Sequence, residues 1–400
     1  MAPGNGEARI GSNVRAARRS RGMSLEVLAG LTGRSKGWLS KIENGRARLE
    51  RRQDIAAIAE ALAVSADSLA GVAAPEIQPH ARSYPTVALR AALLDATIED
   101  PPDVPARPVA VLAELTAEQE QARRRADYDR LTGVLPGLLD ELQTQAATST
   151  GARRELALRS LVQACALATV VLKHLGQGDL AWVAADRGRH AAALLGDPVW
   201  RAAAAFECAH ARFSANKSQA LLATPRIADD LEPQIGDDRF AHEVYGMLRL
   251  SAALACAVQG DHAGADAHSG EAAQIAAPLG DRPEAFGVFG PANVGVWRTS
   301  LAVEAGNAGQ ALAHADAIQP GQLASSNRRA ALHLEKARAC AMLANDADAV
   351  RELRSAERLS PAQARNNPLI RDLVATMLIR ARREAGGRDL RGLAWRMNLI

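Results

Sequence analysis

The segment SLEVLAGLTGRSKGWLSKIENG, residues 24–45, decides the fold of the N-terminal part of this chain. Ser24 and Ser35 each stand where a hydroxyl group can cap the start of a helix, and Gly33 suits the tight turn between two helices. Two short helices joined by a glycine turn form a helix-turn-helix, whose second helix can enter the major groove of DNA. The segment therefore predicts a DNA-binding element.

The flanking sequence extends this segment to a domain of short helices. Residues 10–21 precede it with a helical pattern that turns Val14 inward, and Leu39 faces inward in the second helix of the motif. Residues 54–64 predict a fourth helix and residues 65–69 a short fifth one. We therefore expect an N-terminal domain spanning residues 1–70.

Residues 12–70 resemble the lambda-repressor-like, or XRE-type, helix-turn-helix family in spacing and residue type. The matching residues include Arg18, Gly22, Ser24, Leu28, Ala29, Thr32, Gly33, Leu39, Ser40, Lys41, Ile42, Glu43, Asn44 and Gly45. The base-reading residues that the resemblance implies are Lys36, Gly37, Trp38 and Lys41. The phosphate-contacting residues that it implies are Arg18, Ser35, Asn44 and Arg46.

These residue types suit DNA recognition. Lysine can donate to guanine O6 and N7, and a tryptophan can pack on a thymine methyl group; phosphate contacts fix the register without reading sequence. Leu25 departs from the family, because many members carry glutamine there. The alternative is a helical bundle that does not bind DNA, in which Trp38 packs locally and the arginines form a solvated face.

The charge distribution separates the N-terminal domain, residues 1–70, here called the head, from the rest of the chain. The 48 Lys and Arg residues and 45 Asp and Glu residues give a net charge of +3. Residues 1–70 carry 12 basic and 7 acidic residues, a net charge of +5, and the other 330 residues sum to −2. Nonspecific attraction to DNA phosphates should therefore come from the head and should weaken with salt.

The remainder predicts an all-α protein built from helical repeats. Residues 71–108 hold seven prolines and read as a linker with one helix near 86–97, and residues 109–400 read as a TPR-like helical solenoid. Small residues recur at spacings of 37, 45, 46 and 38 residues, at Val183, Ala220, Ala265, Ala311 and Ala349. The last repeat resembles a tetratricopeptide repeat, through Ala337, Ala349, Ala356 and Pro361. Residues 367–385 and 390–399 are expected to cap the solenoid.

The full chain resembles XRE-type transcriptional regulators of the actinobacterial type with TPR-like C-terminal domains, and its layout is similar to the RRNPP peptide-sensing regulators. The resemblance implies a homodimer on a palindromic double-stranded operator, with a peptide or small-molecule effector bound by the repeat domain. Candidate effector-binding residues are Asn293, Trp297, Arg298, Phe213, Tyr245 and Arg249. Asparagine can pair with a peptide backbone and arginine can hold a carboxylate. The alternatives are that these side chains only fill gaps between repeats, and that the repeat domain is a scaffold that recruits a partner protein to DNA.

Other classes of protein are not expected. The N-terminus lacks the apolar segment of a secretory signal, and no membrane span is expected. Four cysteines without a C-x-x-C pair disfavour a disulfide framework or a zinc site and fit the cytoplasm. No nucleotide-binding or nucleophile motif is present, so we expect neither an enzyme nor a cofactor.

Overall fold

The N-terminal domain is a bundle of short helices in this computed structural model, which describes residues 10–47, 49, 51–62, 64, 69, 86–211, 219–319, 321–381 and 387–400. The described helices of the domain are α1 (Ile10–Ser20), α2 (Leu25–Thr32), α3 (Lys36–Glu43) and α4 (Arg52–Ala61). They match the first four predicted helices. The predicted fifth helix lies almost entirely outside the described residues, although Leu69 is buried in the same core.

The core of this domain follows the predicted inward positions. Val14 and Leu39 are both 0% exposed and pack with Leu28 and Ile58. Leu25, at the position where many family members carry glutamine, is half-buried against this core. Leu25 therefore supports the packing of α2.

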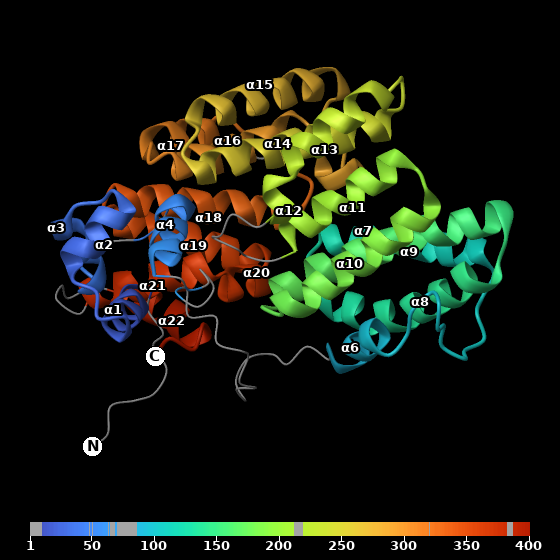
Figure 1. The fold of residues 1–400 in the computed structure, drawn as a ribbon, viewed down its shortest axis with the longest axis horizontal. Coiled ribbons are helices and arrows are strands. Elements are labelled where there is room, and N and C mark those ends of the chain that lie inside the picture. Colours follow the sequence, from blue (N-terminus) through green and yellow to red (C-terminus); the bar gives the residue numbers. More distant parts are fainter. Residues whose placement is uncertain are drawn as a thin grey trace.

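The C-terminal part consists of helix pairs, each with an inner and an outer helix (Figure 1). The inner helices are α7 (Val109–Arg124), α9 (Gly151–His174), α11 (Pro198–His210), α14 (Arg239–Gln259), α16 (Pro291–Glu304) and α18 (Ser326–Met342). The outer helices are α8 (Tyr128–Thr148), α10 (Gly178–Leu195), α13 (Thr224–Leu231), α15 (His262–Leu279), α17 (Ala308–Asp316) and α19 (Asp346–Leu359). The accessory helices are α6 (Thr86–Leu94), α12 (Gln219–Leu222), α20 (Pro361–Asn366), α21 (Pro368–Ala381) and α22 (Arg388–Arg396), with short 3-10 turns at Glu232–Gln234 and Phe286–Val288.

The recurring turn residues explain how the pairs form. Gly260 ends α14 with φ +85°, a left-handed conformation that glycine adopts without strain, and the Asp261 carboxylate then accepts from the Gly264 N–H at 2.9 Å to start α15. The turns at Gly306–Asn307 and Ala344–Asn345 repeat this geometry. Three positions of the repeat pattern, Ala265, Ala311 and Ala349, are buried at the close crossings that follow. The other two differ: Val183 is half-buried on α10, and Ala220 is half-buried on the short α12 and not on an outer helix.

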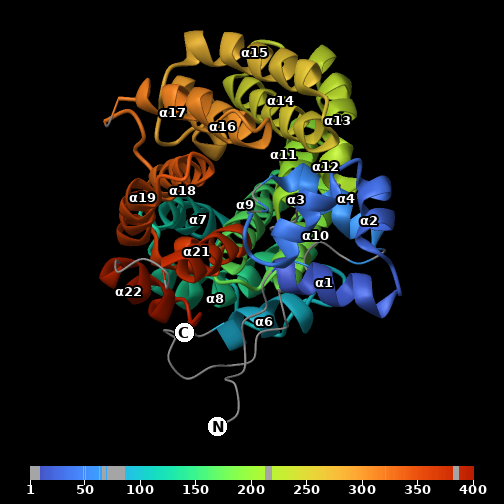
Figure 2. The same cartoon turned by 90° about the vertical axis from the view of Figure 1, so that its left-hand side faces the viewer.

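The six inner helices close into a ring, a closure that the predicted TPR-like solenoid does not by itself imply. Each inner helix contacts the next one, and α18 contacts α7 (Figure 2). A buried polar network joins the two ends: the Tyr128 hydroxyl lies 2.6 Å from His174 Nδ1 and donates to Asn327 Oδ1 at 2.9 Å. The amide of Asn327 in turn donates to the Arg123 carbonyl at 2.9 Å. These contacts give the first and last pairs a shared buried interface.

Replacing Tyr128 with phenylalanine should lower the free energy of unfolding by about 1–3 kcal/mol, because it removes the hydroxyl that faces three buried polar atoms, on His174, Asn327 and Ser360. Urea denaturation measures this change. Thr132→Val is the matched control, since the Thr132 hydroxyl bonds only within α8, to the Tyr128 and Asp129 carbonyls, and its loss should cost less. Equal losses for the two variants would mean that ring closure does not depend on this network.

Three segments depart from the predicted organisation. The α6 helix, assigned to the linker, packs Leu89 and Leu93 into the core of the ring domain. The α21 helix contacts the N-terminal domain as well as α18 and α20, so it is more than a cap. One helix in the described part of the chain, α9, is long and apolar enough to span a membrane, contrary to the reading of the sequence. Two thirds of its apolar window is buried among neighbouring helices, as in the core of a soluble protein.

The N-terminal domain rests on the ring domain at two places. At the first, the Arg51 guanidinium, just before α4, donates to the Glu304 carbonyl at the end of α16 at 2.6 Å. At the second, the Ile10 N–H donates to the Asp372 carboxylate on α21 at 3.1 Å, and Leu369 packs against the N-terminal core. These contacts fix the orientation of the domain.

Candidate nucleic-acid interface

The α3 helix lies at the outer end of the molecule (Figures 1 and 2). Gly33 has φ +64° and turns the chain after α2, and the Ser35 hydroxyl accepts from the Trp38 N–H at 3.2 Å. Leu39 and Ile42 are buried beneath the helix. Local sequence thus fixes both the start of α3 and the face that it presents to solvent.

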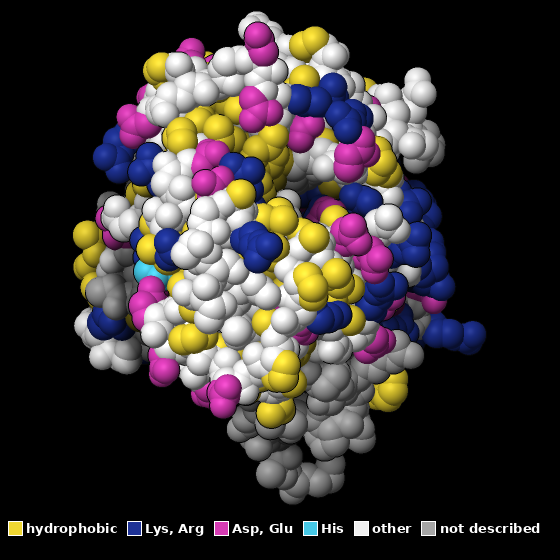
Figure 3. All heavy atoms as spheres, turned by 90° about the vertical axis from the view of Figure 1, so that its right-hand side faces the viewer, with side chains coloured by type: hydrophobic (Ala, Val, Ile, Leu, Met, Phe, Trp, Pro, Cys, Tyr) yellow, Lys and Arg dark blue, Asp and Glu magenta, His cyan; other side chains and the backbone are white. Residues whose placement is uncertain are grey.

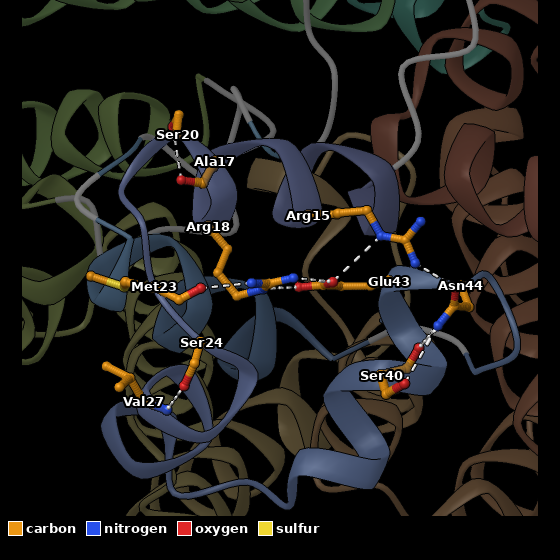
Figure 4. A network of polar contacts seen from close by, with 10 residues as sticks. All are labelled: Arg15, Ala17, Arg18, Ser20, Met23, Ser24, Val27, Ser40, Glu43 and Asn44. Atoms are coloured by element: carbon orange, nitrogen blue, oxygen red, sulfur yellow. Dashed lines mark hydrogen bonds and ion pairs between the residues drawn. The ribbon is translucent and has the colours of Figure 1, made fainter.

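An ion-pair network beneath α3 holds it to α1 (Figure 4). Arg18 binds the buried Glu43 carboxylate through two nitrogens, at 2.6 and 2.9 Å, and also donates to the Met23 carbonyl at 2.6 Å. The Arg18 side chain is only 12% exposed. Hydrogen bonding to Glu43 raises its pKa further, so it stays charged. Sequence reasoning places Arg18 on a phosphate, but in the structure its guanidinium links α1, α2 and α3.

The other predicted phosphate ligands lie around the ends of α3. Ser35, Asn44 and Arg46 are exposed. The Asn44 amide nitrogen donates to the Ser40 carbonyl at 2.7 Å, and its oxygen accepts from Arg15. Arg15 therefore stands beside Asn44 on this surface, a placement that its sequence position does not indicate.

The predicted base-reading residues share one exposed face. Lys36, Gly37 and Lys41 are exposed, and Lys36 forms an ion pair with Glu26 of α2. Trp38 is half-buried, and the Arg34 guanidinium lies 5.5 Å from its ring centroid. One aromatic face is thus engaged within the protein, as in the alternative in which Trp38 packs locally.

Replacing Glu26 with glutamine should strengthen binding to any DNA duplex. The contact with Lys36 lowers the Glu26 pKa to about 2, so the carboxylate is charged at neutral pH, neutralises Lys36 and repels the phosphates of an approaching duplex. We expect the slope of log affinity against log salt to steepen by about one unit, as for one further phosphate contact. Fluorescence anisotropy across a salt series measures the slope. Glu118→Gln, an exposed residue on α7 paired with Arg130, is the charge-matched control and should leave it unchanged.

The predicted effector residues that the structure describes do not form one site. Tyr245 and Arg249 are buried in a cluster between α13, α14 and α15, where Arg249 pairs with Asp229 at 2.7 Å and Glu271 at 3.0 Å. The Tyr245 hydroxyl donates to the same Glu271, and burial raises the pKa of Tyr245 well above its usual value. Their polar atoms are thus committed to one another.

The remaining effector candidates also separate. The Asn293 amide nitrogen donates to the Gly287 carbonyl at 2.9 Å and holds the turn before α16, and Arg298 points to the Ser269 carbonyl on α15 at 3.4 Å. Phe213 lies outside the described residues. Trp297 alone of the six lies beside His210 of α11 and Arg328 of α18. Sequence reasoning missed Arg328, although the pair Arg328–Arg329 at the start of an Ala-rich helix is a signal for it.

Comparison with known proteins identifies the N-terminal domain. A family model described as a helix-turn-helix domain matches residues 9–70. Comparisons with curated proteins and with solved structures give no match. The matched segment contains α1 to α4 and the exposed face of α3. The chain thus carries an N-terminal helix-turn-helix domain, which supports a DNA-binding regulator.

Proposed function

We propose that this protein is a sequence-specific transcriptional regulator of the XRE type that reads DNA with α3. The observation that carries the proposal is the exposed face of α3, which presents Lys36, Gly37 and Lys41 on a helix locked by its own cap and by the Arg18–Glu43 pair. A helix fixed in this way can enter the major groove without ordering itself on binding. Gly37 allows the helix to approach the base edges closely.

The proposed contacts divide into two groups. Lys36 and Lys41 donate to guanine, with the outer edge of Trp38 against a thymine methyl group. Ser35, Asn44 and Arg46 bind phosphates on either side and set the register. Arg15 joins this second group because it lies beside Asn44.

The protein acts as a homodimer in this proposal. One copy of α3 covers only one half-site, so two copies would read half-sites about 34 Å apart on a roughly palindromic operator. The ring domain supplies the dimer contacts and binds an effector. Effector binding changes the spacing of the two recognition helices only if the effector binds more tightly to one of two arrangements of the dimer than to the other. Arg51 and Ile10, through which the head touches the ring domain, provide the physical connection for such a shift.

Selection of bound sequences from a random duplex library tests the proposal. The full chain should enrich a common motif with two related half-sites. Enrichment of single half-sites would argue against the dimer, and no enrichment would argue against sequence-specific reading. Capture of a partner protein by the ring domain, without sequence enrichment, would favour the scaffold alternative.

A further inference from the structure

The inner helices of the ring surround a region, here called the channel, in which aromatic and basic side chains from four of these helices lie close together. Rings of α11 and α16 contact one another there: the Phe206 and His210 ring centroids lie 4.7 Å apart, and the His210 and Trp297 centroids lie 5.4 Å apart in an edge-on arrangement. The Arg328 guanidinium of α18 lies 5.8 Å from the Trp297 ring centroid. Arg123 of α7 is close enough for its charge to act on Arg328. Figure 3 shows the end of the molecule opposite the recognition helix hollowed, with hydrophobic and charged side chains around the hollow.

Two hydrogen-bond donors in this wall have no acceptor within the part of the chain that the structure describes. Trp297 is 9% exposed, and its indole Nε1 is buried without a partner. The Arg328 Nε is buried without a partner as well, and Arg328 forms no ion pair among the described residues. An unmet buried donor is costly, and two on neighbouring side chains indicate a missing acceptor.

The local charge favours an anion as that acceptor. Burial and the nearby Arg123 lower the pKa of Arg328 to about 10, which leaves it protonated at neutral pH. Arg123 is already paired with Glu120, so its charge is balanced. The nearest acid facing Arg123 from α11 is Glu207, and burial raises its pKa to about 7, so it is only partly charged. The charge of Glu335 also acts on Arg328, but Glu335 is paired with Arg338 at 2.7 Å, so Arg328 has no ion pair of its own among the described residues.

We propose that the channel binds a small ligand with a carboxylate or phosphate group on an apolar, ring-sized body. Arg328 and the Trp297 indole hold the anionic group, and Phe206, His210 and Trp297 pack against the apolar body. Both anionic groups accept from a guanidinium in the same way, so the shared chemistry defines the class. The inference deepens the proposed function, because it gives the effector a site and a charge.

Calorimetric titration of the full chain tests this site without DNA, using phenyl phosphate, benzoate, inorganic phosphate and benzyl alcohol as probes. The charged ring compounds should bind better than benzyl alcohol and better than inorganic phosphate. A preference for phenyl phosphate or for benzoate then identifies the natural anionic group. Equal weakness of all four probes would overturn the proposal.

Two substitutions assign the binding to the proposed residues. Arg328→Gln should weaken the best probe by at least about tenfold, as expected for loss of a charged hydrogen bond, and Trp297→Phe should weaken it less because the ring remains. Arg391→Gln, at an exposed arginine on α22, is the matched control and should bind like the unaltered chain.

Thermal unfolding separates a ligand-binding role from a structural one. Removing an unpaired buried charge should leave the melting temperature of Arg328→Gln unchanged or raised. A marked fall in melting temperature with unaltered probe binding would contradict the proposal. The variant Lys36→Ala/Lys41→Ala should bind the probes like the unaltered chain, because these lysines lie on α3 and not in the channel. This result separates the test of the ligand site from the test of DNA recognition.

Discussion

Replacing Lys36 and Lys41 together with alanine should lower the affinity for a selected operator by about 30-fold or more. Each lysine can contribute a base contact of about 1–3 kcal/mol, and the double substitution removes both. Both side chains are exposed on α3, and an exposed ion pair such as Lys36–Glu26 adds little to stability. The melting temperature of the variant should therefore stay close to that of the unaltered chain.

The control for this variant removes the same charge elsewhere. Arg153 and Arg159 are exposed on α9 of the ring domain and do not belong to the helix-turn-helix domain. The variant Arg153→Ala/Arg159→Ala should therefore bind the operator normally. Anisotropy titrations with selected and scrambled duplexes measure both variants. An unchanged operator affinity for Lys36→Ala/Lys41→Ala would remove α3 from base reading.

Replacing Arg338 with methionine should lower the free energy of unfolding by about 3–5 kcal/mol. Arg338 on α18 is 2% exposed and binds Glu304, which is 0% exposed, at 2.9 Å. The substitution leaves a deeply buried carboxylate without this cation, and that loss exceeds the net value of an ion pair. The pair also stabilises the end of α16, where the Glu304 carbonyl receives Arg51 from the DNA-binding domain.

Urea denaturation of three variants tests this effect. Glu304→Gln combined with Arg338→Met should recover part of the loss, because no buried carboxylate remains at position 304. Arg354→Met breaks an exposed pair with Asp389 between α19 and α22 and should cost less than about 1 kcal/mol. A loss for Arg338→Met as small as that of Arg354→Met would mean that the Glu304 site is hydrated.

Local features were predictable from the sequence because their causes lie within a few residues. The caps at Ser24 and Ser35 and the glycine turns fix α2 and α3 wherever the domain packs. Asp127, Asp261, Asn307 and Asn345 start the outer helices α8, α15, α17 and α19 in the same way. The family model at residues 9–70 confirms the helix-turn-helix domain that these signals predict.

Long-range features were not predictable, because the partners are far apart in the chain. The hydrogen bond from Tyr128 to Asn327 joins residues 199 positions apart, and nothing near either residue indicates ring closure. The pairing of Arg18 with Glu43 spans 25 positions, so an arginine in a basic helix reads as a phosphate ligand until the fold is known. Trp297 and Arg328 meet only because α16 and α18 are neighbours in the ring.

The ratio of dissociation constants for a scrambled and a selected duplex, measured with the full chain at one salt concentration near physiological, tests the central claim most directly. We predict a ratio of about 1,000 or more, as for specific DNA-binding proteins, that falls toward one in Lys36→Ala/Lys41→Ala. A ratio near one for the unaltered chain, with binding that depends on salt alone, would show that the basic head binds phosphate without reading sequence and would contradict the account.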